Sequence, residues 1–338
     1  MTYDQGRMRL IVQIPCLNEA KTLPQTIRDI PRDIPGVDEV ELLVIDDGSS
    51  DGTSEVAHRL GVEHVIRFTN HKGLAQAFYA GIDAALKLGA DIIVSTDADN
   101  QYRGEDIARL IQPILDGSAD MVIGDRQVHS LEHVSRTRRQ LQRVGSALVR
   151  QASDTGIPDA TSGFRAYNRQ AALQLTIFTE FSYTLETLIQ AGRKQIAVTS
   201  VPVGTNPPLR PSRLFANTWE YVWRSGITVI RIYAMYKPLR FFGTVGLAFF
   251  LAGAALLARF LYFFATGQGE GHLQSVVIGG TCLVIAIQAW FAGVVADLLA
   301  KNRRITEDVL YRVRQIELGA ASSADQVEEF VELLERRT

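Results

Sequence analysis

The stretch DADNQ at residues 97–101 places two carboxylates one residue apart, directly after an apolar run at residues 92–94. Like charges this close repel each other and resist burial, so a positive partner is expected beside them. Alternate residues of an extended chain point the same way, which lets Asp97, Asp99 and Gln101 converge on one cation. Oxygen ligands suit Mg²⁺ or Mn²⁺, which often also bind substrate phosphate oxygens. We therefore predict that this loop holds a divalent ion and, through it, a diphosphate.

A second acidic pair, Asp46 and Asp47, opens the stretch DDGSSDGT at residues 46–53. Residues 50–53 have the composition of a polar turn that leads into a helix near Ser54. One acidic residue would be enough for such a turn. We therefore interpret the pair as hydrogen-bonding groups for the base or ribose of a nucleotide.

Arginines are the basic residues best placed to bring anions together. Arg126 directly follows the apolar stretch DMVIGD, which reads as a strand. At least half of the arginines between residues 136 and 143 are expected on a solvated helix face. His129 and His133 have the spacing of metal ligands, but no third ligand is recognisable nearby, which favours surface histidines over zinc.

The elements that position these loops are short apolar strands alternating with helices. Strands are predicted at RLIVQIP, VELLVID, HVIRF, DIIVST and DMVIGD, and a helix at GLAQAFYAGIDAALKLG. This alternation predicts an α/β fold with a mostly parallel sheet that binds ligands at the carboxyl ends of its strands. Beyond residue 138 we predict a loop at DATSGFRAYN, a helix near residues 184–191 and a strand at IAVTSVPV.

Two uncharged apolar segments, residues 241–258 and 273–296, are each close to the length of about 20 residues that crosses a membrane. Lys and Arg flank the pair on its outer sides, which predicts a hairpin with both ends in the cytoplasm. A buried hairpin of a soluble protein is the alternative. Residues 215–236 mix aromatic residues with arginines, which suits a helix at the membrane interface or a helix packed on the domain. The tail from residue 305 is amphipathic and predicted to be helical; it mediates self-association or is solvated.

Composition excludes several classes of protein. The chain has 338 residues, 21% charged residues and a net charge of −2, which argues against binding of nucleic acid. Its two cysteines, Cys16 and Cys282, imply no disulfide framework. The first fifteen residues read as the start of a buried strand, not as a secretory signal peptide.

Six stretches occur in the order typical of family 2 glycosyltransferases, which have the GT-A fold: PCLNEA, VIDDGSSDGT, HKGLAQA, STDADNQ, IGDR and SGFRAYN. With the hairpin added, the chain resembles polyprenyl-phosphate glycosyltransferases of the dolichol-phosphate mannose synthase group. The resemblance implies a metal-dependent, inverting hexosyltransferase that moves a sugar from a UDP- or GDP-linked donor to a polyprenyl phosphate. It also implies an inner-membrane location with a cytoplasmic catalytic domain, and makes a homo-oligomer such as a tetramer plausible.

Site residues follow from the same resemblance, position by position. The nucleotide sugar would be bound by Pro15, Leu17, Glu19, Ile45, Asp47, Asp97, Ala98, Asp99 and Gln101. The lipid phosphate would be bound by Arg126, Arg138, Arg139, Arg210 and Arg213. Catalysis would rest on Asp97, Asp99 and Arg126, and the Mg²⁺ or Mn²⁺ ion on Asp97, Asp99 and Gln101. Two departures, Leu17 in place of an aromatic residue and Tyr-Arg-Gly at residues 102–104 in place of His-Pro-Pro, leave the base and the sugar open.

The expected domains are a GT-A domain at residues 1–210, juxtamembrane helices at 211–238, a transmembrane hairpin at 239–300 and a helical tail at 301–338. Two rival functions remain. Glu186 occupies a position where relatives with hydroxyl acceptors place a base, so the acceptor could be a lipid hydroxyl of diacylglycerol type. The other rival is a non-catalytic membrane sensor of nucleotide sugars.

Overall fold

The computed structural model describes residues 7–127, 156–176, 183–207, 230–231, 233–235, 237–267 and 273–335, with side chains as far as residue 319. The chain divides into two compact units. The first comprises Met1–Val222 and Leu310–Thr338, and the second comprises Trp223–Val309.

The first unit is built on a seven-stranded sheet with the strand order β3-β2-β1-β4-β6-β5-β7. Neighbouring strands run parallel, except that β6 is antiparallel to both β4 and β5. The strands are β1 (Arg9–Cys16), β2 (Glu39–Asp46), β3 (His64–Arg67), β4 (Ile92–Ser95), β5 (Met121–Asp125), β6 (Arg165–Asn168) and β7 (Val198–Pro202).

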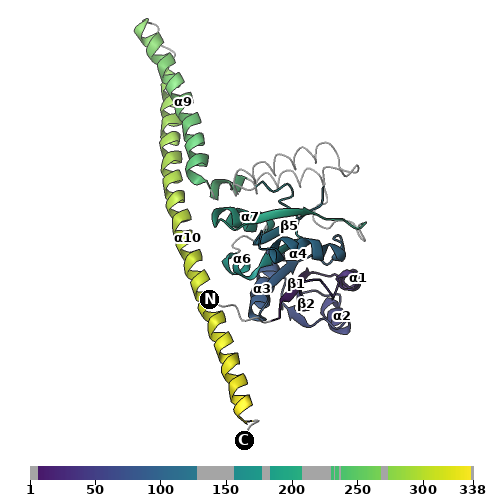
Figure 1. Ribbon diagram of the computed structural model, residues 1–338. Helices are drawn as coiled ribbons and strands as arrows, with labels where there is room; N and C mark the ends of the chain where they lie inside the picture. The colour runs from purple at the N-terminus through teal and green to yellow at the C-terminus, as the bar shows by residue number, and fades with distance from the viewer. Residues whose placement is uncertain are drawn as a thin grey trace. The chain divides into compact units, whose positions relative to one another are not determined.

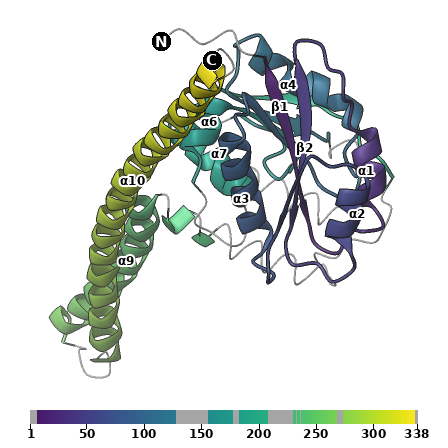
Figure 2. The ribbon, with the colours of Figure 1, turned by 90° about the horizontal axis from the view of Figure 1, so that it is seen from below.

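Helices cover both faces of this sheet. On one face, Leu23, Ala57 and Leu110 join a buried apolar cluster with side chains of β1, β2 and β4. On the other face, the ring of Phe78 stacks on Tyr183 with 4.1 Å between centroids. Figure 2 shows α3 on one side of β1 and β2, and α1 and α2 on the other. The first face is covered by α1 (Leu23–Asp29), α2 (Thr53–Arg59) and α4 (Ile107–Leu115), and the second by α3 (Leu74–Lys87), α6 (Arg169–Gln174) and α7 (Tyr183–Arg193).

Most of the predicted elements are confirmed, including the strands that became β1 to β5 and β7 and the helices α3 and α7. The prediction of a loop throughout DATSGFRAYN is wrong for residues 165–168, which form β6. This short strand pairs with β4 on one side and β5 on the other. Its four residues show no clear hydrophobic period, so pairing within the sheet decides its conformation and the local pattern does not.

The direction of the strands determines where the loops meet. Parallel strands end at one common edge of a sheet, so the loops after β1, β2, β4 and β5 lie at that edge. Because β6 is antiparallel, its first residue lies there too: Arg165 pairs with Ser95 of β4 and Ile123 of β5. The loop that precedes β6 therefore reaches the same edge from the opposite direction.

The second unit contains α9 (Pro238–Ala265) and the first part of α10 (Leu273–Glu335), which run side by side (Figure 1). Both helices are long and apolar enough to span a membrane, with a mean hydropathy of 2.1 in their most apolar windows. Only 11% of each window is buried. That exposure favours a membrane hairpin over the buried hairpin of a soluble protein.

Small residues bring α9 and α10 into close contact. A Cβ added to Gly253 would lie 2.8 Å from the carbonyl oxygen of Gly279, and one added to Gly246 would lie 2.4 Å from Nε1 of Trp290. Close backbone approach at small residues is how helices typically associate in lipid, where burial of apolar surface provides no net driving force.

The helical tail is confirmed as far as Glu335, because α10 continues without a break beyond its apolar part. The predicted interface helix at residues 215–236 lies almost entirely outside the described residues.

A substitution at Gly104 tests the packing of the loop after β4. Its Cβ would lie 2.0 Å from the backbone oxygen of Asp29, a clash that only a backbone shift relieves. We expect Gly104→Ala to reduce the free energy of unfolding by about 3 kcal/mol. Thermal unfolding of the detergent-solubilised protein measures this. The control is Gly156→Ala, where a Cβ meets nothing within 4 Å; equal melting temperatures of the two variants would contradict the packing.

Candidate functional site

The loops at the carboxyl edge of the sheet turn sharply. Asn18, Asn100 and Gln127, which follow β1, β4 and β5, have φ values of 56°, 56° and 49°. This left-handed conformation is uncommon for residues other than glycine, and asparagine tolerates it best. Such turns redirect the chain at the strand end and leave the polar side chains of the loops at the edge.

The loop DADNQ is held by contacts on two sides. The carbonyl oxygen of Ala98 accepts a hydrogen bond from Oγ1 of Thr26, at 3.0 Å. Asn100 donates to Asp29 at 2.8 Å, and its own carbonyl accepts from Asn206. Within the loop, one carboxylate oxygen of Asp99 accepts the backbone N–H of Gln101, at 3.1 Å. Asp97, Asp99 and Gln101 all remain partly exposed, so ligands can reach them.

Gly163, in the loop before β6, lies against Asp97. A Cβ at Gly163 would lie 3.2 and 3.3 Å from the two carboxylate oxygens of Asp97 and 2.9 Å from the hydroxyl of Tyr183. A larger residue would therefore force the β6 loop, Asp97 and α7 apart. Burial, and then the charge of Asp97, raise the pKa of Tyr183 well above its ordinary value. Its hydroxyl consequently stays protonated beside the carboxylate.

Arg126 forms a bidentate pair with Asp159. Nε of Arg126 lies 2.8 Å from one carboxylate oxygen, and Nη2 donates to the other at 3.1 Å and to Thr161 at 3.0 Å. Burial opposes the charges of both groups, but their pairing outweighs it. The pKa of Asp159 is therefore lowered, and the pKa of Arg126 is raised by Tyr102, by Asp159 and by Asp97. Asp97 and Arg126 thus belong to one electrostatic site.

Tyr102 is a structural member of this site. Its hydroxyl accepts the backbone N–H of Gly163 at 3.0 Å, and its ring stacks on Phe164 with 5.0 Å between centroids. The guanidinium carbon of Arg126 lies 6.0 Å from the centre of the same ring. The departure from His-Pro-Pro therefore places a buried aromatic residue between the Asp97 loop and the β6 loop.

A fully buried guanidinium holds the β6 loop in place. Arg165 donates to the carbonyl oxygens of Ser162 at 2.7 Å and Ala160 at 2.8 Å, both within that loop. It also donates to the carbonyl oxygen of Thr184 and to Oγ1 of Thr187 on α7, each at 2.8 Å. These bonds offset the cost of burying the cation and join the β6 loop to α7.

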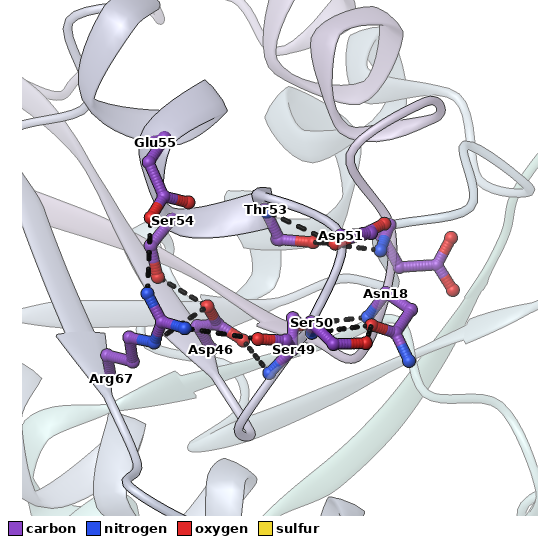
Figure 3. A network of polar contacts seen from close by, with 10 residues as sticks. Asn18, Asp46, Ser49, Ser50, Asp51, Thr53, Ser54, Glu55 and Arg67 are labelled. Carbon is purple, nitrogen blue, oxygen red and sulfur yellow. Dashed lines mark hydrogen bonds and ion pairs between the residues drawn. The ribbon is translucent and has the colours of Figure 1, made fainter.

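The loop after β2 is organised around Asp46 (Figure 3). This buried carboxylate accepts the backbone N–H of Ser49 at 2.8 Å and the hydroxyl of Ser54, and Arg67 lies 3.9 Å from it. The same network ties Ser50 to Asn18 of the loop after β1. Asp46 thus serves the turn itself, which is the role that the sequence analysis assigned only to residues 50–53.

Asp47 anchors a different segment. Its two oxygens accept the backbone N–H groups of Lys72 at 2.7 Å and Gly73 at 2.9 Å, and His71 lies 2.8 Å away. An ionised carboxylate offers about four acceptor positions, so one further donor can be accommodated. Asp47 is nevertheless only 2% exposed, so its hydrogen bond to a nucleoside stays a prediction.

The other residues predicted for the nucleotide lie at the ends of β1 and β2. Pro15 and Ile45 are neighbours in the sheet and are buried. Leu17 is half-buried directly after β1, and the buried Glu19 accepts a hydrogen bond from Thr22 at 2.7 Å. The structure thus gathers Pro15, Leu17, Ile45 and Asp47 at one place.

Several predicted residues lie outside the described part of the chain: Arg138, Arg139, Arg210, Arg213, His129 and His133. Glu186 is described; it lies on α7 and is 2% exposed.

The donor set fits a hard divalent cation. Among the described residues, no three His, Cys, Asp or Glu side chains gather as ligands. The two carboxylates and the amide of the DADNQ loop supply only oxygen donors. Mg²⁺ is commonly bound by one or two carboxylates together with substrate phosphates and water, so this set is sufficient.

Sequence reasoning missed Asp159, Gly163, Arg165 and Tyr183, although the first three lie in the quoted stretch DATSGFRAYN. An acidic residue, a glycine and an arginine within seven positions are only weak evidence of a site, and the stretch was predicted to be a loop. The antiparallel course of β6 brings Gly163 to Asp97 and Asp159 to Arg126.

The Arg126–Asp159 pair predicts a pH-dependent loss of stability on mutation. Removing one charge of a buried pair leaves the other uncompensated, so Asp159→Asn should destabilise the protein by about 3 kcal/mol at pH 7. Because the pKa of Asp159 is lowered in the folded state, its contribution is present above the ordinary carboxyl pKa of about 4 and declines as the pH falls below that value.

Thermal unfolding between neutral and acidic pH measures this difference. Asp116→Asn, at an exposed carboxylate on the edge of α4, is the control and should change little. A constant difference between wild type and Asp159→Asn down to the lowest pH would contradict the charge pairing.

Comparison with known proteins agrees with this architecture. Residues 11–176 match the model of glycosyl transferase family 2. The glycosyltransferase AglJ of Haloferax volcanii is 28% identical over 313 residues, covering 90% of this chain and 96% of its own length. The polyprenol monophosphomannose synthase of Mycolicibacterium smegmatis is 34% identical over 169 residues, covering 48% of this chain and 62% of its own. An uncharacterized glycosyltransferase of Mycobacterium bovis is 30% identical over 197 residues, covering 58% of this chain and 84% of its own length.

Among solved structures, glucosyl-3-phosphoglycerate synthase from Mycobacterium tuberculosis, in complex with Mn²⁺, UDP and glucosyl-3-phosphoglycerate, superposes with a TM-score of 0.51. The match covers 68% of this chain and 79% of the synthase chain, at 23% sequence identity. It therefore shows a likeness of fold. The GT-A fold expected from the sequence is confirmed. The chain belongs to glycosyl transferase family 2.

Proposed function

We propose that this glycosyltransferase transfers a sugar from a nucleotide-sugar donor to a polyprenyl phosphate at the cytoplasmic face of the cell membrane. Transfer depends on Mg²⁺ or Mn²⁺ and inverts the anomeric centre. The observation that carries the proposal is the meeting of a carboxylate loop and a restrained arginine at one edge of the sheet, in a chain with two helices long enough to span a membrane.

Asp97, Asp99 and Gln101 would hold the divalent ion against the donor diphosphate. The ion, when bound, neutralises the diphosphate and makes the nucleotide a better leaving group. Gly163 and the hydroxyl of Tyr183 lie beside Asp97. The nucleoside would lie at the ends of β1 and β2, beside Asp47, which already accepts the N–H groups of Lys72 and Gly73.

Arg126 would bind the acceptor phosphate. Its Nε and Nη2 donate hydrogen bonds to Asp159 and Thr161. For Nη1 the described residues provide no hydrogen-bond acceptor, so both its N–H groups can point at an anion. A guanidinium fixed on one side by a carboxylate loses little conformational freedom when it binds a phosphate on the other. Arg138, Arg139, Arg210 and Arg213 remain proposed members of the same phosphate site.

A phosphate acceptor needs no general base, because it is already anionic and can attack the anomeric carbon directly. Attack opposite the leaving diphosphate inverts that centre. The relatives support this acceptor: the Mycolicibacterium smegmatis protein is named a polyprenol monophosphomannose synthase, and another of Micrococcus luteus an undecaprenyl-phosphate mannosyltransferase. The solved structure with Mn²⁺ and UDP supports a divalent ion and a nucleotide donor.

A lipid hydroxyl is the alternative acceptor, with Glu186 as its base. One observation favours keeping it: Glu186 is buried one helical turn after Tyr183, whose hydroxyl lies beside Asp97. The two acceptors differ in whether Glu186 is needed. Glu186→Gln should leave transfer to a phosphate within about threefold of wild type, whereas loss of a general base costs a factor of about 10²–10⁴.

The decisive experiment measures transfer by the purified protein in lipid nanodiscs. UDP- and GDP-sugars are screened with undecaprenyl phosphate, with and without EDTA. We expect a labelled lipid product that is cleaved by mild acid, as a phosphodiester-linked sugar is. Asp97→Asn and Asp99→Asn should each lower the rate by a factor of at least about 10², since each removes a charge that holds the ion.

Asp116→Asn is the matched control and should retain full activity. A product stable to mild acid would indicate a glycolipid and a hydroxyl acceptor. Binding of nucleotide sugar without metal and without product would indicate a sensor. Full activity of the doubly neutralised protein, Asp97→Asn with Asp99→Asn, would refute the proposed site.

A further inference from the structure

One side chain in the extension of α10 is buried although its neighbours are exposed. Residues from Leu310 onward belong to the first unit together with the sheet. Arg312, Val313, Gln315 and Ile316 are exposed, but Arg314 is only 5% exposed. A buried cation is unfavourable unless its hydrogen bonds and charge are satisfied. The partners of Arg314 therefore indicate what this helix binds.

Those partners come from two helices that cover the same face of the sheet. Nη1 of Arg314 donates to the carbonyl oxygen of Leu175, at the end of α6, at 3.0 Å. Nη2 donates to the hydroxyl of Tyr79 on α3, and the guanidinium carbon lies 4.9 Å from the centre of that ring. Asp83, one turn further along α3, lies 3.9 Å away. A carbonyl, a hydroxyl, an aromatic face and a carboxylate thus surround one guanidinium.

Weaker contacts lie on either side of this anchor. One turn before it, the hydroxyl of Tyr311 accepts a hydrogen bond from Gln170 of α6 at 2.7 Å. One turn after it, Glu317 lies 3.4 Å from Lys87 at the end of α3. The contacts span two turns of helix, with the buried residue at their centre and exposed pairs at their ends.

We propose that residues 311–317 of α10 are a docking segment that binds the surface formed by α3 and α6, with Arg314 as its anchor. The role of this docking rests on the function proposed above. The same uninterrupted helix contains a candidate membrane span, so the docked segment provides a connection to the catalytic domain besides the chain before α9. A second connection raises the effective concentration of the domain at an acceptor held in the bilayer.

Docking also acts on elements that lead to the site. Just before α3, the N–H groups of Lys72 and Gly73 bind Asp47, and α6 directly follows β6, which begins at Arg165. The segment contacts α3 from Tyr79 to Lys87 and both ends of α6, at Gln170 and Leu175, and none of these residues belongs to the proposed substrate sites. Arg314 is therefore a positioning residue, and the chemistry itself should not require it.

Crosslinking tests the docking directly in the full-length protein. A carbodiimide should join the Lys87 amine to the Glu317 carboxylate, and mass spectrometry identifies the joined peptides. We expect this crosslink in the wild type, its loss in Arg314→Ala and its retention in Arg312→Ala. The control removes the same charge from an exposed position two residues away. A crosslink that is absent in the wild type, or unchanged in Arg314→Ala, overturns the docking.

Transfer to two different acceptors tests the role of the docking in catalysis. Undecaprenyl phosphate in nanodiscs is compared with a short, water-soluble prenyl phosphate such as geranyl phosphate. For Arg314→Ala we expect the ratio of bilayer to soluble kcat/KM to fall about tenfold, the loss expected for a hydrogen-bonded charged group. Arg312→Ala should keep the wild-type ratio. An equal loss on both acceptors would mean that Arg314 only supports folding and would overturn the proposed role.

Tyr79→Phe covers the case in which Arg314→Ala does not fold. This variant keeps the ring under the guanidinium and removes only the hydroxyl acceptor, so it should lower the crosslink yield and the acceptor ratio in the same direction by less. An unchanged ratio together with a reduced crosslink would again overturn the role. If the wild type transfers sugar to neither phosphate, the proposed function fails, and the crosslink still decides the docking.

Discussion

The antiparallel pairing of β6 between β4 and β5 is the constraint on which the site depends. A parallel strand in that position would begin at the opposite edge of the sheet, far from the loops after β1, β2 and β4. Because β6 runs the other way, its first residue pairs with Ser95 and Ile123 at the edge where the Asp97 loop begins. Gly163 then contacts Asp97, and Asp159 meets Arg126.

Charge balance at this edge follows from that arrangement. The two guanidinium groups of this region, Arg126 and Arg165, have different kinds of partner. Arg165 donates to carbonyl and hydroxyl oxygens and holds the backbone, whereas Arg126 donates to Asp159 and Thr161 through Nε and Nη2. A carboxylate loop that attracts a cation and an arginine that attracts an anion can lie side by side because a third group, Asp159, restrains the arginine. This combination suits a reaction between two phosphate-bearing substrates.

The two helices of the second unit are long and apolar enough to span a membrane. In α9 and α10, apolar side chains are exposed and small residues face one another, the reverse of the pattern in the sheet domain. Beyond its apolar part, α10 changes character within one uninterrupted helix: Arg314 is buried against polar partners on α3 and α6. One helix therefore contains both a candidate membrane span and a buried polar contact with the sheet domain.

The sequence alone determined the α/β class, nearly all strands of the sheet, the helices α3 and α7, and the two apolar helices. Each of these has a local period or an apolar length that does not depend on its neighbours. It also indicated the DADNQ loop and Arg126, because polar residues directly after apolar strands lie at the edge where open α/β sheets bind ligands.

The tertiary structure decided the rest. RAYN has no hydrophobic period, so it forms β6 only because the edges of β4 and β5 are available to pair with it. The positions of Asp159, Gly163 and Arg165 depend on that pairing. The two acidic residues at 46–47 look alike in the sequence, yet one faces its own turn and the other the segment at 71–73. Arg314 looked like one more charge on an amphipathic tail. Its burial depends on a tyrosine 235 positions earlier, a contact that only the folded chain can bring about.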